Sequence, residues 1–179
     1  MGEDKVLLKT NGKTWLVNMV SLFEELGLPY FVSCNEIQSR YLSTLVDNKN
    51  IVVDYPIYQG PLLGMMSTAL ISEEDLFMLA CDMQQMDIDK MRQLLDAYKK
   101  DSSYEVYVYK RNDFFEPLCG IYTKRALNKI KEEVDLFKGN FSFQYLLREK
   151  LKTKVLEVRD ATFLKNYNSR EDLDQIVLN

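Results

Sequence analysis

Residues 51–82 read IVVDYPIYQGPLLGMMSTALISEEDLFMLACD, and this stretch decides the fold class. Two apolar runs, Ile51 to Val53 and Leu76 to Cys81, lack polar alternation, which is typical of strands buried on both faces. Between them, a proline directly after a glycine predicts the start of a helix that runs to Leu70. A strand, a helix and a second strand in this order predict a parallel sheet.

The same alternation continues on both sides of this unit. Apolar spacing and capping residues predict helices at 15–26, 35–45, 87–100, 123–135 and 142–150, strands at 30–34 and 155–158, an antiparallel hairpin at 105–122, and a last helix capped by Ser169. A chain of 179 residues is long enough for one compact domain. We therefore expect a single domain over residues 1–179, an α/β fold with a mostly parallel sheet, a mixed antiparallel edge and helices on both faces.

The composition limits the partners and the catalytic groups that the chain can have. The net charge is −4, which argues against a nucleic-acid partner, because lysines and arginines supply much of the affinity for phosphates. No apolar run approaches the roughly 18 residues that span a bilayer, and the first residues lack the pattern of a signal peptide, so we expect a cytoplasmic protein with no membrane partner. Histidine is absent. Histidine-dependent nucleophiles and HExxH zinc sites are thereby excluded, which leaves carboxylates, lysine, arginine, backbone amides or an oxygen-bound metal.

Polar residues follow three of the expected strands. Asp54 and Asp82 each end an apolar run, and Asn35 follows Cys34 at the end of a third. Ligands of open α/β sheets bind beyond the carboxyl ends of the strands, and carboxylates there suit Mg²⁺, which prefers oxygen ligands. The alternative is that both aspartates only open turns or cap helices. The pattern by itself favours neither.

Two further features are weaker when each is taken alone. In the stretch Gly60-Pro61-Leu62-Leu63-Gly64, glycine lets the backbone approach a ligand, and the helix that follows offers free amides to an anion. Such a turn is more often only the start of a helix. Lys5 could meet a phosphate, but a lysine near a terminus is usually just solvated.

The order of these pieces carries a resemblance over nearly the whole chain. The pieces are MGEDKVLL at 1–8, NGK at 11–13, VSCN at 32–35, Asp54 ahead of GPLLG, LACDMQ at 79–84, EPL at 116–118 and NYNSREDL at 166–173. Together they resemble the molybdenum cofactor guanylyltransferase family, whose members are MobA-like nucleotidyltransferases. The resemblance implies a Rossmann-like nucleotide-binding α/β sandwich. It also implies a reaction in which GMP from GTP is joined to molybdopterin or Mo-molybdopterin and pyrophosphate is released.

The resemblance also implies roles for single residues. Lys5 would contact the GTP phosphates, and Asp82 would bind Mg²⁺, so these two are the expected catalytic residues. The nucleotide site would be formed by Ser33, Asn35, Asp54, Gly60, Pro61 and Gly64. Asn166 and Asn168 match a segment on the pterin side. Beyond its substrates, such a protein would meet molybdoenzyme chaperones or other proteins of cofactor biosynthesis.

The chain departs from the family pattern in two places. Gln84 stands where a proline commonly follows the CDM triplet, and Ser33 or Asn35 stands where an asparagine often lies near the base. The family also begins with a strand and a glycine-rich loop, of which this chain carries only the last part, so we expect an N-terminally truncated domain with impaired activity. The alternatives are a related cytidylyltransferase or sugar-phosphate nucleotidyltransferase, and a noncatalytic module that keeps the fold.

Overall fold

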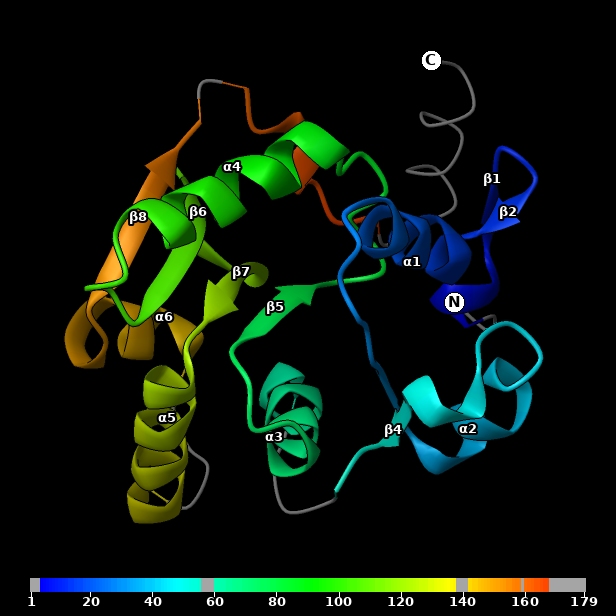
Figure 1. Cartoon of the computed structure of the whole chain (residues 1–179), viewed down its shortest axis with the longest axis horizontal. Helices are drawn as coiled ribbons and strands as arrows, with labels where there is room; N and C mark the ends of the chain where they lie inside the picture. The colour runs from blue at the N-terminus through cyan, green and yellow to red at the C-terminus, as the bar shows by residue number, and fades with distance from the viewer. Residues whose placement is uncertain (1–3, 56–59, 138–141, 159, 168–179) are drawn as a thin grey trace.

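A computed structural model describes residues 4–55, 60–137, 142–158 and 160–167, and Figure 1 shows the whole chain. Two strands, β3 (Val32–Cys34) and β4 (Ile51–Val53), form a parallel pair. A four-stranded sheet has the order β5 (Leu76–Leu79), β7 (Phe114–Tyr122), β6 (Val106–Arg111) and β8 (Thr153–Glu157). These six strands therefore lie in the places along the chain that the apolar runs predict.

The four-stranded sheet contains one strand that runs against the others. β7 is antiparallel to both β5 and β6, whereas β6 and β8 are parallel. The expected α/β fold is confirmed. The antiparallel strand, however, lies inside this sheet and not at its edge, because β8 pairs with the outer side of β6 and places Thr153 opposite Val106.

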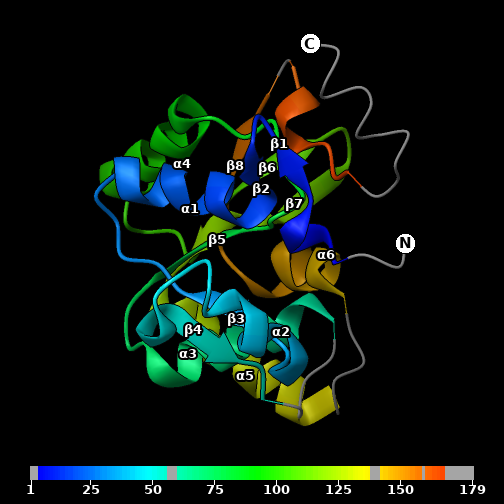
Figure 2. The same cartoon turned by 90° about the vertical axis from the view of Figure 1, so that its right-hand side faces the viewer.

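Helices cover both faces of the sheet (Figures 1 and 2). On one face lie α1 (Trp15–Glu25), which Thr14 caps, and α4 (Ile88–Lys100), which Asp87 caps. On the other face lie α3 (Pro61–Ile71) and α5 (Lys124–Phe137). Met91 and Leu94 of α4 join one apolar cluster with Tyr107 and Ile121 of the sheet. A second cluster joins α3 and α5 to the opposite face and includes Met65, Val108 and Ile130. The expected helices on both faces are thus confirmed.

Short elements fill the rest of the described chain. They are η1 (Lys5–Leu7), the hairpin of β1 (Lys9–Thr10) and β2 (Lys13–Thr14), α2 (Glu36–Leu42), η2 (Asn48–Asn50), α6 (Phe143–Tyr145), the π-helical turn η3 (Leu146–Lys150) and η4 (Thr162–Leu164). The β1–β2 hairpin was not among the expected elements, although Asn11-Gly12 at its tip is a strong turn signal and both residues have positive φ. The expected helix at Ser169 lies outside the described residues.

Apolar side chains pack against both faces of β5, yet every residue of this strand remains partly exposed. Leu76 and Met78 pack into the cluster under α3 and α5, while Phe77 and Leu79 pack into the cluster under α4. All four residues nevertheless keep partial exposure. Within the described residues, β5 is hydrogen-bonded to β7 alone, and the β3–β4 pair forms a separate sheet. The exposure therefore follows from an edge of β5 that no described strand covers.

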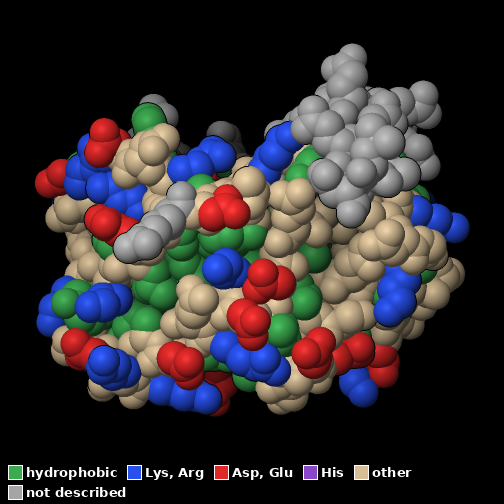
Figure 3. All heavy atoms as spheres, turned by 90° about the horizontal axis from the view of Figure 1, so that it is seen from above, with side chains coloured by type: hydrophobic (Ala, Val, Ile, Leu, Met, Phe, Trp, Pro, Cys, Tyr) green, Lys and Arg blue, Asp and Glu red, His purple; other side chains and the backbone are tan. Residues whose placement is uncertain are grey.

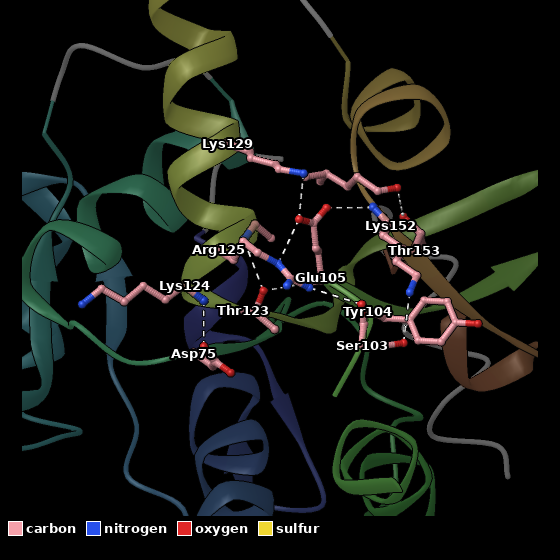
Figure 4. Close-up of polar contacts among 12 residues, drawn as sticks. Asp75, Ser103, Tyr104, Glu105, Thr123, Lys124, Arg125, Lys129, Lys152 and Thr153 are labelled. Atoms are coloured by element: carbon pink, nitrogen blue, oxygen red, sulfur yellow. Dashed lines mark hydrogen bonds and ion pairs between the residues drawn. The ribbon is translucent and has the colours of Figure 1, made fainter. Parts of the chain in front are cut away.

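A buried carboxylate ties three elements together away from this edge. The Glu105 side chain, 5% exposed, lies 3.0 Å from Arg125 Nε and 2.8 Å from Lys129 Nζ, both on α5. The Lys152 amide, just before β8, donates to its other oxygen at 2.9 Å (Figure 4). Burial by itself raises the pKa of Glu105, but the hydrogen bonds from Lys129 and Lys152 and the neighbouring positive charges lower it below its ordinary value. Glu105 is thus held ionised as a structural junction.

The surface over α1 and α4 carries charges of both signs. Figure 3 shows lysine, arginine, aspartate and glutamate side chains interspersed over this face, with hydrophobic side chains between them. Within the described part of the chain, no helix is both long and apolar enough to cross a lipid bilayer.

Candidate functional site

Lys5 and Asp82 meet in space although they lie far apart in the sequence. Lys5 Nζ is 3.2 Å from Asp82 Oδ2, and the two side chains are 35% and 19% exposed. Lys5 is the first residue of η1, and Asp82 follows the carboxyl end of β5. The two expected catalytic residues therefore form one partly exposed ion pair just beyond the carboxyl end of β5.

The segment that carries Lys5 is anchored by its neighbour Asp4. Asp4 caps η1, since its Oδ1 accepts a hydrogen bond from the Val6 amide at 3.2 Å. Its Oδ2 accepts from Gln38 Nε2 at 2.6 Å and from the Tyr41 hydroxyl, both on α2. Partial burial works to raise the pKa of Asp4, but these hydrogen bonds lower it below its ordinary value, so the carboxylate stays charged. Sequence reasoning missed Asp4, Gln38 and Tyr41, because only tertiary folding brings them together.

The turn that carries Asp82 is tied to α1 by Gln84. Gln84 Nε2 donates to the Cys81 carbonyl at 2.6 Å and to the Trp15 carbonyl at 3.3 Å, and Gln84 Oε1 accepts from Asn18 Nδ2 at 3.1 Å. The residue that replaces the family's proline thus ties this turn to α1. We did not expect this role from the sequence, where Gln84 was only a departure.

The segment near residue 166 reaches the same turn. The Tyr167 amide donates to the Asp82 carbonyl at 3.2 Å. The buried Tyr167 ring meets Trp15 edge-on, with ring centroids 6.4 Å apart. Asn166 is exposed and directly precedes Tyr167, so this predicted residue lies next to the segment that contacts Asp82. Asn168 lies outside the described residues.

A second group of predicted residues gathers at the ends of β3 and β4. Ser33 Oγ donates to Asp54 Oδ1 at 2.5 Å. Gly64 of α3 packs against both residues, because a Cβ placed on it would overlap the Ser33 hydroxyl and lie 3.2 Å from Ser33 Cβ and 3.7 Å from Asp54 Oδ1. Only glycine therefore leaves the Ser33–Asp54 hydrogen bond intact. Ser33, Asp54 and Gly64 form one cluster.

The start of α3 and the start of α2 differ in what their amides can do. Gly60, with φ 58° and ψ −148°, caps α3 without any side-chain hydrogen bond, and Pro61 begins the helix. Gly60 and Pro61 are exposed, whereas Leu62 is buried. The Leu63 amide already donates to the Gly60 carbonyl at 3.0 Å, so this helix start can offer an anion only its remaining amides. At α2, by contrast, the Asn35 side chain already accepts from the Gln38 amide at 2.8 Å, and Gln38 Oε1 accepts from the Asn35 amide at 3.0 Å. The Asn35 side chain thus serves as a helix cap.

Two thiols near these groups stay protonated at neutral pH. Burial, followed by the charge of Asp54, raises the pKa of Cys34 to about 11. Burial, followed by the charge of Asp82, raises the pKa of Cys81 to about 11 as well. Neither thiol is a ready nucleophile or metal ligand in this state.

The described residues offer one carboxylate for a cation at the end of β5. They contain no group of three or more Cys, Asp or Glu side chains arranged to hold a metal. Mg²⁺ is usually held by one or two carboxylates together with water and substrate phosphates, and not by a cage made wholly of protein. Asp82, partly exposed, fits that mode of binding. The described residues thus include a lysine paired with a carboxylate after β5 and, separately, a helix start whose cap uses no side chain, and groups of both kinds can bind an anion.

Comparisons with known proteins show the family and the fold of the chain. The family described as MobA-like NTP transferase domain matches residues 1–151. A protein of Aquifex aeolicus named "Probable molybdenum cofactor guanylyltransferase" is 27% identical over 183 residues, which cover 98% of this chain and 83% of that protein. Among solved structures, molybdopterin-guanine dinucleotide biosynthesis protein A from Archaeoglobus fulgidus has a TM-score of 0.79 at 18% identity and covers 99% of this chain and 90% of its own. A manganese complex of Rv0371c from Mycobacterium tuberculosis has a TM-score of 0.72 at 13% identity and covers 99% and 94%.

Proposed function

We propose a reaction for this chain, which belongs to the family of MobA-like NTP transferase domains and is thus a nucleotidyltransferase. It joins GMP from GTP to the terminal phosphate of molybdopterin or Mo-molybdopterin and releases pyrophosphate. The observation that carries the proposal is the Lys5–Asp82 pair at the end of β5. The name of the Aquifex relative supports the choice of GTP and of the pterin acceptor.

The chemistry needs charge neutralisation more than proton transfer. An anionic phosphate oxygen of the acceptor attacks the α-phosphorus of GTP, a new P–O–P bond forms, and the bond between the α-phosphorus and the bridging oxygen breaks as pyrophosphate leaves. No strong base is required, because the attacking oxygen is already ionised, and this agrees with a chain that has no histidine. Lys5 would neutralise charge on the phosphates, and its ion pair with Asp82 keeps it near its place before the ligand binds.

The nucleotide would lie along the ends of β3 and β4 and over the start of α3. Asp54, oriented by its hydrogen bond from Ser33, would accept hydrogen bonds from the nucleoside. Gly60 and Pro61 would let phosphate oxygens approach the first amides of α3. Asn166, next to the segment that contacts Asp82, would face the pterin side.

The cation that we propose is Mg²⁺, held by Asp82, by phosphate oxygens and by water. Bound there, it would supply positive charge to the α-phosphate and the leaving pyrophosphate. Asp82 would then exchange Lys5 for the cation, and Lys5 would donate to phosphate oxygens. The manganese complex of Rv0371c supports a divalent ion in this fold.

We also propose that transfer by these 179 residues alone is weak. The support is the edge of β5, which no described strand covers, at the very strand that leads to Asp82. A strand and a glycine-rich loop upstream, as the resemblance implies, would pair with this edge and add backbone amides around the phosphates. If so, a protein extended by in-frame upstream codons should bind GTP more tightly than the 179-residue chain does.

The experiment measures formation of the guanine dinucleotide product and pyrophosphate from GTP, Mg²⁺ and molybdopterin, with the chain and with the extended protein. We expect Asp82→Asn to lower the rate by about 100-fold, since it removes the one carboxylate at the cation position. Asp75→Asn is the matched control, because Asp75 precedes the same strand at its other end, where it accepts from the Tyr98 hydroxyl. It should leave the rate unchanged.

Three outcomes separate the alternatives. If CTP or UTP displaces GTP, the protein is a cytidylyltransferase or sugar-phosphate nucleotidyltransferase. If neither protein binds any nucleotide, the fold serves a noncatalytic function. If Asp82→Asn transfers GMP at the normal rate, the proposed role of the Lys5–Asp82 pair is wrong.

A further inference from the structure

The Asp4 carboxylate lies between the two halves of the candidate site. The charges of Asp54 and Asp4 both act on the Cys34 thiol at the end of β3, and the charges of Asp82 and Asp4 both act on the Cys81 thiol at the end of β5. The contacts place Asp4 in the same way. Gln38, which donates to Asp4 Oδ2, also closes the capping box with Asn35 after β3, and Lys5, which follows Asp4, pairs with Asp82 after β5.

The contacts of Asp4 form a continuous path from α2 to Lys5. The Tyr41 hydroxyl and Gln38 Nε2 donate to Asp4 Oδ2, and Asp4 Oδ1 accepts from the Val6 amide in the turn that Lys5 begins. Gln38 is also the residue that closes the capping box with Asn35 at the end of β3. The α2 side chains Tyr41 and Gln38 are thus linked through Asp4 to the turn that begins at Lys5.

Two alternatives for Asp4 are less consistent with these contacts. If Asp4 only capped η1, one acceptor oxygen would suffice, yet its second oxygen is used by two donors that lie 34 and 37 residues away. If it were a ligand group, its lone pairs would be left for the ligand, yet three of its roughly four acceptor positions are used within the protein. A role that acts through its neighbour Lys5 accounts for all three hydrogen bonds.

We infer that Asp4, held by Tyr41 and Gln38, is a positioning residue that sets where Lys5 lies relative to Asp82. Through Asp4, the part of the site at the end of β3 is coupled to the part where Lys5 meets the phosphates. The inference rests on the proposed function, since Lys5 is taken to meet the phosphates of a nucleoside triphosphate. Its structural part, the coupling of α2 to η1, can be measured without any ligand.

The test uses two variants: one removes a single donor to Asp4, and the other removes the oxygen of Asp4 that accepts from both α2 side chains. Tyr41→Phe removes the hydroxyl alone, and Tyr98→Phe is its matched control, since the Tyr98 hydroxyl also donates to a carboxylate, Asp75, at 2.6 Å. Both phenols stay protonated at neutral pH: burial, followed by Asp4, raises the pKa of Tyr41 to about 12, and the bond to Asp75, followed by burial, raises that of Tyr98 to about 12. The pair therefore compares equal chemistry at two places. Asp4→Asn is the second variant; it can keep the cap on Val6 but accepts at one oxygen only.

The first measurement is hydrogen exchange of the Val6 and Leu7 amides in the free protein. We expect Tyr41→Phe and Asp4→Asn to speed this exchange by about fivefold, because the turn that Asp4 caps loosens. Tyr98→Phe should leave it unchanged. Unchanged exchange in Tyr41→Phe and Asp4→Asn would overturn the inference whatever the protein binds.

The second measurement is the affinity for GTP with Mg²⁺, with the extended protein used if the chain alone binds too weakly. We expect a loss of about tenfold in Tyr41→Phe and none in Tyr98→Phe, since a displaced lysine contributes less to phosphate binding. Equal losses of GTP affinity in both tyrosine variants would mean that Tyr41 only stabilises the fold, and this result would overturn the inference. If exchange responds as expected but neither wild-type protein binds GTP, the coupling of α2 to η1 stands and the proposed function fails.

Discussion

The four-stranded sheet and the β3–β4 pair are held by different forces. The sheet β5–β7–β6–β8 lies between two large apolar clusters, and its one buried carboxylate, Glu105, is fully paired. The β3–β4 pair rests on a smaller cluster, the Ser33–Asp54 hydrogen bond joins the ends of its two strands, and Asp4 accepts a hydrogen bond from the adjoining helix α2. Stability is therefore concentrated in the first region, while groups able to handle a ligand gather in the second.

Two glycines, one in each region, show the same difference in their surroundings. A Cβ on Gly120 of β7 would overlap Val108 Cγ1 and lie 2.7 Å from the Tyr107 carbonyl oxygen. A Cβ on Gly64 of α3 would overlap the Ser33 hydroxyl instead. The same added methyl group therefore meets backbone in one region and a polar side chain in the other.

The largest effect is expected from Gly120→Ala. Backbone in the middle of a sheet cannot move aside cheaply, so the free energy of unfolding should fall by about 3 kcal/mol. Urea unfolding followed by circular dichroism measures the loss. The folded fraction should bind GTP as before, and a loss below about 1 kcal/mol would mean that the sheet gives way more easily than its packing indicates.

Glu105→Gln tests the paired carboxylate of the same region. A glutamine can satisfy either the Lys152 amide or the α5 cations, but not both, so we expect a loss of about 2 kcal/mol in the free energy of unfolding. Nucleotide binding should not change, because Glu105 lies at the start of β6, away from the strand ends that carry the candidate site. Changed binding would show that the two regions are coupled.

The same variant predicts a difference in pH dependence. The pKa of folded Glu105 lies below its ordinary value of 4.5, so its contribution to stability is complete above the unfolded pKa and is lost as the pH falls through the folded pKa. Wild type should thus lose more stability than Glu105→Gln when the pH is lowered from about 6 to about 3. Parallel curves from urea unfolding at each pH would contradict the assigned ionisation.

The smallest effect on stability is expected from Gly64→Ala. Ser33 can rotate away, at the loss of its hydrogen bond to Asp54. We therefore expect the free energy of unfolding to fall by only about 1 kcal/mol, whereas the affinity for GTP should fall about tenfold. In a Ser33→Ala background the hydroxyl is already gone, and Gly64→Ala should then cost less affinity. Strictly additive losses in this double-mutant cycle would argue that Gly64 acts on the ligand directly.

Most elements could be predicted because their signals are local. Asn35 with Gln38 three residues later predicts the capping box that begins α2, and the unalternated runs at 51–53 and 76–81 predict β4 and β5. The hairpin at Asn11-Gly12 carried an equally local signal and was overlooked. The split of the expected helix at 142–150 into α6 and η3 has no comparable signal in the sequence.

The candidate site could be predicted in its residue types but not in its contacts. The position of Asp54 and Asp82 after buried strands indicates which side chains stand at the ligand edge. That Lys5 pairs with Asp82, that Ser33 donates to Asp54, and that Tyr41 holds Asp4 could not be predicted, since each contact joins distant segments.

By itself, the sequence determined which segments become helices and strands, where several helices begin, and which chemistry is left to a chain without histidine. Those properties depend on residue type and on spacings of two to four residues, which the chain carries whether or not it is folded. Only the tertiary structure decided that β7 runs between β5 and β6, that Gln84 ties the Asp82 turn to α1, and that Asp4 joins α2 to Lys5. These depend on which apolar faces are buried against each other, and that packing is settled between whole elements and not within any one of them.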